Sequence, residues 1–133
     1  MHVDGRCHCG NITYVAEIDP AGVSICHCTD CQVLCGSPWR ASVQTQAASF
    51  RFTGAEPAIY IKTAESGRRR RQAFCGACGT PIYSATEHDP QTFNLRIGAI
   101  VQRAQLTPKV QDWTRSALPW ASDISELPAG KNT

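Results

Sequence analysis

Eight cysteines in a chain of 133 residues, most with another cysteine one or two positions away, constrain this sequence more than any other feature. They fall as Cys7 with Cys9, then Cys26, Cys28 and Cys31, then Cys35, then Cys75 with Cys78. A disulfide framework tends to separate its cysteines so that the bonds close long loops. The opening residues 1–6 carry no apolar stretch, so we expect no signal peptide and a reducing, cytoplasmic location. Both observations favour metal ligands over disulfides.

The spacing within each cluster suits zinc. In an extended chain, Cys-x-Cys places both sulfurs on one side of the strand, because strand side chains repeat every second residue. Neighbouring thiolates repel unless a cation lies between them, and zinc accepts four sulfurs in a tetrahedron. Gly10, Gly76 and Gly79 beside the cysteines permit the positive φ that a tight turn around a metal requires. A redox dithiol at Cys75 and Cys78 is the weaker alternative, because the residues that follow, 81–83, indicate a strand rather than a helix.

Counting ligands predicts two zinc ions per chain, of unequal character. A closed four-sulfur set, typical of a structural zinc, consists of Cys7, Cys9, Cys75 and Cys78. The middle cluster supplies three ligands within six residues: Cys26, Cys28 and Cys31. Three protein ligands with an open fourth position are the arrangement of a catalytic zinc. The alternative is that Cys35 or His27 completes the middle set, which would make it structural too.

Alternating patterns predict a small, mainly β domain. Strands are expected at 11–18, 23–26, 39–43, 49–52, 58–63, 81–85 and 93–97, with the segment 68–74 leading into the last cysteine pair. Thr29 or Asp30 is expected to cap one helical turn that ends before Gly36. The length predicts one domain over residues 1–133, in which 121–133 form a loose tail.

The charge balance limits the partners. Thirteen basic and eleven acidic residues give a net charge of +2, so a nucleic-acid partner is not expected, and no run is long and apolar enough for a membrane span. One charge run, Arg68–Arg71, is open to two interpretations. It is a solvated strand with alternating faces, or it binds anions such as the carboxylates of a small ligand or nucleic-acid phosphates.

Four ordered motifs carry a family resemblance: GRCHCG at 5–10, CHCTDCQ at 26–32, GS at 36–37 and FCGACGT at 74–80. Over about 5–113 the chain resembles the glutathione-dependent formaldehyde-activating enzyme family, also called the centromere protein V/formaldehyde-activating domain. The resemblance implies a β-tent of antiparallel sheets, a structural zinc on the four-cysteine set and a second zinc on the three-cysteine set. It also implies a carbon–sulfur lyase whose small thiol partner is glutathione, acting on an S-hydroxymethylglutathione-like adduct.

Three hypotheses on function therefore stand. In the first, an open zinc site lowers the pKa of a substrate thiol, which then adds to an aldehyde, with His27 as one candidate for moving the proton. The second is a non-enzymatic zinc-binding module that contacts an anionic partner. The third is a sensor in which the middle cysteines release zinc on oxidation.

Overall fold

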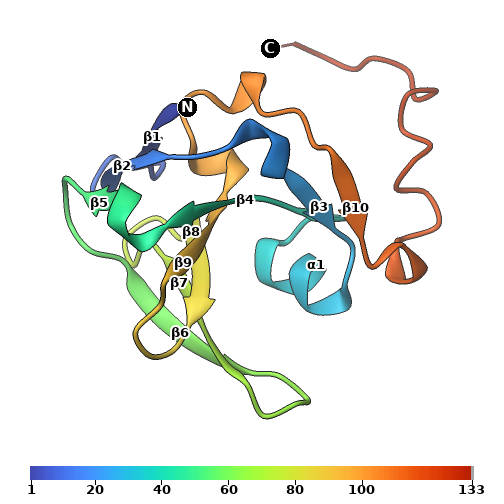
Figure 1. Ribbon diagram of the computed structural model, residues 1–133. Coiled ribbons are helices and arrows are strands. Elements are labelled where there is room, and N and C mark those ends of the chain that lie inside the picture. Colours follow the sequence, from blue (N-terminus) through green and yellow to red (C-terminus); the bar gives the residue numbers. More distant parts are fainter. Residues whose placement is uncertain (133) are drawn as a thin grey trace.

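The computed structural model describes residues 1–132 and folds them into two β-sheets and one short α-helix (Figure 1). The smaller sheet has the strand order β1–β2–β5, with β1 at His2–Arg6, β2 at Thr13–Glu17 and β5 at Phe50–Phe52. The larger sheet has the order β10–β3–β4–β9–β8–β7–β6. Its strands, in chain order, are β3 (Ser24–Cys26), β4 (Arg40–Gln46), β6 (Ala58–Thr63), β7 (Arg69–Phe74), β8 (Pro81–Thr86), β9 (Thr92–Arg96) and β10 (Val110–Asp112). Helix α1 spans Thr29–Cys35.

Every strand pair is antiparallel except β3 with β10, which is parallel. The mainly β prediction is confirmed, but the larger sheet is mixed rather than antiparallel throughout. The chain between β9 and β10 crosses back over the molecule, with Ile100 bridged to Gly5 of β1. It then reaches the sheet edge beside the start of β3, where the Lys109 amide donates to the Val23 carbonyl. From that end β10 must run in the same direction as β3.

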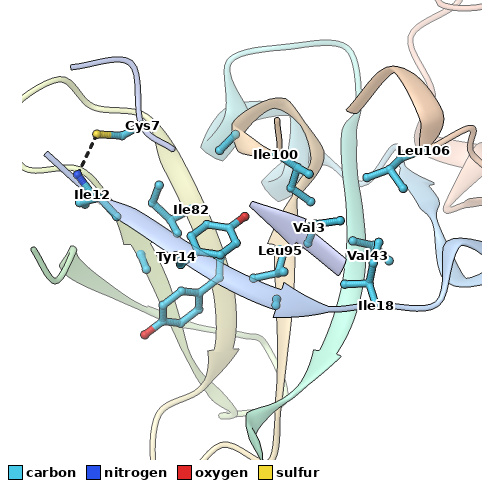
Figure 2. Close-up of a cluster of buried hydrophobic side chains, with 14 of the residues drawn as sticks. Val3, Cys7, Ile12, Tyr14, Ile18, Val43, Ile82, Leu95, Ile100 and Leu106 are labelled. Carbon is cyan, nitrogen blue, oxygen red and sulfur yellow. Dashed lines mark hydrogen bonds between the residues drawn. The ribbon is translucent and has the colours of Figure 1, made fainter. Parts of the chain in front are cut away.

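The core lies between the two sheets. Val3 and Tyr14 from the smaller sheet and Val43, Ile82 and Leu95 from the larger one are almost wholly buried there (Figure 2). Rings from both sheets meet in the same layer; they are Tyr14, Phe50, Phe52, Tyr83 and Phe93. Each fully buried side chain of this size stabilises the fold by about 1.5–3 kcal/mol. Burial between the sheets is therefore the main apolar contribution to stability.

The opposite face of the larger sheet is polar, and α1 lies on that side. Directly paired residues of antiparallel strands point to the same face. One row across the sheet, Val43–Leu95–Tyr83–Ala73, enters the core. The alternate positions carry polar residues on the other face. Ser42 is paired with Arg96, Asn94 with Ser84, and Ser84 with Gln72. Asp30 of α1 reaches across to Lys62 of β6 at 2.8 Å, so the helix and the sheet enclose space above these polar residues.

The strands expected from the sequence agree with the structure to within a few residues, whereas β1 and β10 were not expected. The helix is capped by Cys28, whose sulfur accepts from the Cys31 amide, and not by Thr29 or Asp30. Ala121 is buried, and residues 122–132 are exposed and form neither helix nor strand; Thr133, the end of the tail expected at 121–133, lies outside the described residues. Among the described residues, no helix is long and apolar enough to cross a membrane.

Candidate metal centres

Four cysteine sulfurs from two distant turns meet at one end of the molecule. The first turn joins β1 to β2 and the second joins β7 to β8; the cysteines are Cys7, Cys9, Cys75 and Cys78, and their sulfurs all lie within 4.8 Å of one another. The Cys9 sulfur lies 3.6 Å from that of Cys7 and 3.8 Å from that of Cys75. Four sulfur atoms, which are soft donors, lie close together between the two turns. The set therefore fits a tetrahedral zinc ion.

Both turns are shaped for this role by the backbone. Gly10 has a φ of +82° and Gly79 a φ of +81°, in the left-handed region that glycine adopts without steric cost. Backbone amides then point at two of the sulfurs: the Ile12 amide donates to Cys7 at 3.2 Å and the Cys78 amide to Cys75 at 3.4 Å. Such donors stabilise thiolates, the form in which cysteine binds a metal.

One thiol in this four-cysteine set is already acidic. A hydrogen bond from the Thr80 hydroxyl, with the sulfur–oxygen distance at 3.2 Å, lowers the pKa of Cys78 to about 5. Thr80 also accepts from the His8 amide at 3.0 Å, which ties the two turns together next to the sulfurs. Cys78 is therefore a thiolate at neutral pH.

Three further sulfurs meet at the junction of β3 and α1. Cys26 ends β3, Cys28 caps the helix and Cys31 lies in its first turn, and their sulfurs also lie within 4.8 Å of one another. Burial raises the pKa values of Cys26 and Cys31. Burial acts the same way on Cys28, but hydrogen bonds involving Cys31 and the positive charge of Arg40 outweigh it, so the pKa of Cys28 is lowered. The triplet thus contains one thiol that is favoured to ionise.

Neither neighbour that could complete the triplet points at it. The Cys35 sulfur donates to backbone carbonyls instead, most closely to that of Trp39 at 3.3 Å. The ring of His27 is buried, and its Nε2 hydrogen-bonds Gln111 Oε1 at 2.9 Å. Within residues 1–132, no fourth histidine, cysteine or carboxylate ligand joins the three sulfurs. The geometry thus leaves a fourth coordination position free of protein ligands in the described part of the chain.

Two arginines on the polar sheet face adjoin the triplet, and neither was expected from the sequence as a site residue. Arg40 of β4 is paired directly with Cys26, and Arg96 of β9 with Ser42 two residues further along β4. Both line a cavity of about 350 Å³ next to Leu34 of α1 and a second of about 450 Å³ next to Cys35. A third hollow of about 500 Å³ borders Cys26 on the side of Trp113 and Arg115.

Arg96 is unusual for a buried cation. Only 7% of its surface is exposed, its Nη1 donates to the Ser42 hydroxyl, and its Nη2 has no hydrogen-bond partner among the described residues. Burial lowers the pKa of Arg96 to about 9, and the nearby charge of Arg40 acts in the same direction. The sequence offers no signal for Arg96 beyond its being the single charged residue of β9, and its place beside the triplet follows only from the pairing of β4 with β9.

The arginine run splits between the two faces of β7, as the strand interpretation predicts. Arg69 forms a forked pair with the Glu87 carboxylate at 2.7 and 2.9 Å, and Arg71 donates to the Glu87 backbone carbonyl at 2.7 Å. Arg70 lies on the other face, half-buried among the polar residues. Two of the four arginines are therefore occupied by partners within the chain.

Comparison with known proteins adds three findings. A family model described as glutathione-dependent formaldehyde-activating enzyme matches residues 2–116. An uncharacterized lyase of Schizosaccharomyces pombe is 37% identical over 82 residues, which cover 62% of this chain and 56% of that protein, so the match spans little more than half of the relative's length. A crystal structure of a Rhodobacter sphaeroides protein has a TM-score of 0.62 at 17% identity, covering 84% of this chain and 99% of that one. The last likeness concerns the fold alone.

Proposed function

The chain belongs to the glutathione-dependent formaldehyde-activating enzyme family, and on this premise we propose that it is a zinc-dependent carbon–sulfur lyase. Its substrate would be a glutathione–aldehyde adduct of the S-hydroxymethylglutathione type, or the adduct of a related small thiol. The observation that carries the proposal is the three-sulfur set at the start of α1, which no further ligand completes within the described residues. A lyase name on a relative supports the reaction class.

Two zinc ions would have different roles. The four-cysteine set of Cys7, Cys9, Cys75 and Cys78 would hold a structural ion, since four sulfurs leave no position for a substrate. The triplet of Cys26, Cys28 and Cys31 would hold the reactive ion. An ion held there would act as a Lewis acid and lower the pKa of a substrate thiol into the neutral range.

The reaction itself is a reversible addition. The substrate thiol loses its proton, and its sulfur forms a bond to the carbonyl carbon of the aldehyde. The π electrons of the C=O bond move to oxygen, which takes up a proton, giving the S-hydroxyalkyl adduct; the reverse step breaks the carbon–sulfur bond. The positive charge of Arg40, which favours the ionised form of Cys28, also favours a substrate thiolate beside it. Because the chemistry needs free thiols, we place it in a reducing compartment such as the cytoplasm.

A non-enzymatic zinc module that contacts an anionic partner is less well supported. An anionic partner of such a module would contact the arginine run Arg68–Arg71, but Glu87 already engages Arg69 and Arg71.

The first test uses the zinc-loaded protein with glutathione and ¹³C-formaldehyde. The rate of exchange between free and adduct formaldehyde is measured by NMR exchange spectroscopy, and native mass spectrometry counts zinc and bound glutathione. We expect two zinc ions, glutathione uptake and exchange faster than in buffer, with the acceleration lost in Cys28→Ser.

Cys35→Ser is the matched control, because it changes a cysteine four residues beyond Cys31 whose sulfur faces backbone carbonyls. It should keep both zinc ions. A Cys28→Ser protein that exchanges as fast as wild type, or a wild type that holds two zinc ions yet takes up no thiol, would contradict the lyase proposal.

A further inference from the structure

A row of polar side chains on the larger sheet leads away from the cysteine triplet. Cys26 lies opposite Arg40, Arg40 is followed on the same face of β4 by Ser42, and Ser42 lies opposite Arg96. Because these positions all face away from the core, Cys26 and the two arginines share one surface of the larger sheet. Helix α1 lies beside the β3–β4 part of that sheet (Figure 1). The row continues through Asn94, Ser84 and Gln72 to Arg70 and Lys62.

Lys62 on this surface pairs with Asp30, but Arg40 and Arg96 have no carboxylate partner among the described residues. The two cavities that share Arg40 and Arg96 in their walls have no aspartate or glutamate lining among the described residues. Arg40 uses one nitrogen to donate to Gln72 Oε1 at 3.1 Å, and Arg96 keeps its Nη2 buried and unpartnered within residues 1–132. A buried hydrogen-bond donor without a partner is costly, so the Nη2 of Arg96 indicates a ligand that accepts a hydrogen bond from it.

We propose that Arg96 and Arg40 bind a carboxylate of the substrate and hold its thiol toward the cysteine triplet. This inference rests on the proposed function and names the substrate class more closely: a small thiol that carries a carboxylate, as a peptide thiol does. A guanidinium offers two parallel N–H donors, which match the two oxygens of a carboxylate. The cavities of about 350 and 450 Å³ are large enough for a ligand of that size.

Arg96 is better placed to bind a carboxylate than the arginines of the run Arg68–Arg71. Arg69 and Arg71 face Glu87, which neutralises them, whereas Arg96 is enclosed and lies on the face of the triplet. A ligand that binds at Arg96 therefore accepts a hydrogen bond from a donor that has no other partner among the described residues. A ligand that binds at Arg69 would first have to break the ion pair with Glu87.

The test separates anion binding from thiol chemistry with two probes. S-methylglutathione carries both carboxylates but no free thiol, and its diethyl ester has the same body with the carboxylates masked. Binding of each to zinc-loaded protein is measured by calorimetry for wild type, Arg96→Met and Arg40→Gln. Arg69→Met is the matched control, since it removes the same charge from the same sheet at a position that faces Glu87.

We expect Arg96→Met and Arg40→Gln each to weaken S-methylglutathione binding about tenfold or more. The ester should bind weakly to every variant, and Arg69→Met should bind S-methylglutathione as wild type does. Thermal unfolding adds a second readout: Arg96→Met should melt no lower than wild type, because the substitution removes an unsatisfied buried charge. A residue with a merely structural role would lower the melting temperature without discriminating between the two probes.

The result that overturns the inference is equal binding of S-methylglutathione and its ester, or undiminished binding to Arg96→Met and Arg40→Gln, or no binding to wild type. These results are independent of the lyase proposal, which fails instead when Cys28→Ser exchanges formaldehyde as fast as wild type. If Arg96→Met does not fold, Arg40→Gln decides the question, because the Arg40 side chain is only partly buried.

Discussion

At the scale of single residues, Tyr14 has a hydroxyl group without a partner in the core. Its oxygen is buried and accepts or donates no hydrogen bond among the described residues, and burial raises the pKa of the phenol. An unsatisfied buried polar group costs about 1–3 kcal/mol. Tyr14→Phe removes the group and keeps the ring, so we expect the free energy of unfolding to rise by about 1 kcal/mol or stay unchanged. Chemical denaturation measures it, with Tyr60→Phe on the exposed part of β6 as control. A loss of 1 kcal/mol or more would mean that the hydroxyl is satisfied in solution.

Gly5 is the cross-strand partner of Tyr14 and leaves room for its ring. A Cβ at Gly5 would lie 2.0 Å from ring atoms of Tyr14, well inside contact distance. Gly5→Ala therefore forces the ring to move within a packed core, and we expect it to destabilise the protein by about 1–3 kcal/mol. Gly98→Ala serves as control in the same denaturation measurement, because no atom lies within 4 Å of a Cβ built there. Equal effects of the two substitutions would contradict the packing argument.

At the scale of elements, the pairing of Arg69 on β7 with Glu87 just beyond β8 predicts a pH dependence. The hydrogen bonds from Arg69 lower the pKa of Glu87 below its ordinary value of 4.5. A carboxyl whose folded pKa is depressed contributes stability above its unfolded pKa, and that contribution is lost as the pH falls through the folded pKa. Unfolding followed between pH 6 and pH 3 should thus show a steeper loss of stability below about pH 4.5 in wild type than in Glu87→Gln. Parallel pH profiles would show that the pair contributes nothing.

The sequence predicts most of the strands because their alternation is local information. It does not predict β1, in which the second inward position is Gly5 and carries no apolar side chain, or β10, whose three residues are all exposed. Both strands form because a neighbouring strand is in place, β2 for β1 and β3 for β10. The tertiary fold determines which strands become neighbours. The candidate site likewise has a part that local sequence predicts and a part that it does not. Cysteine clusters are visible because the ligands are neighbours in sequence, whereas Arg40 and Arg96 meet only through the register of β4 with β9.

At the scale of the whole molecule, the four-cysteine set joins the two sheets. It links the β1–β2 turn of the smaller sheet to the β7–β8 turn of the larger one, and Cys9 and Cys75 are 66 residues apart in sequence. A metal ion held there closes a long loop, and its binding free energy becomes part of the folding free energy. The triplet, in contrast, lies within six consecutive residues and closes no long loop. Loss of metal from the two sets should therefore have different consequences for the fold.

Cys9→Ser and Cys28→Ser test this difference. Cys9 is exposed, so its replacement by serine removes no packed surface, and any loss of stability reflects the lost ligand. We expect Cys9→Ser to lower the free energy of unfolding by several kcal/mol, as treatment of wild type with a strong chelator should. Cys28→Ser should lose one zinc ion and the acceleration of formaldehyde exchange while unfolding close to wild type. Thermal denaturation with zinc counted by mass spectrometry measures both. If the two variants lose equal stability, the four-cysteine set is not what holds the sheets together, and the burial of the core between them must carry that role alone.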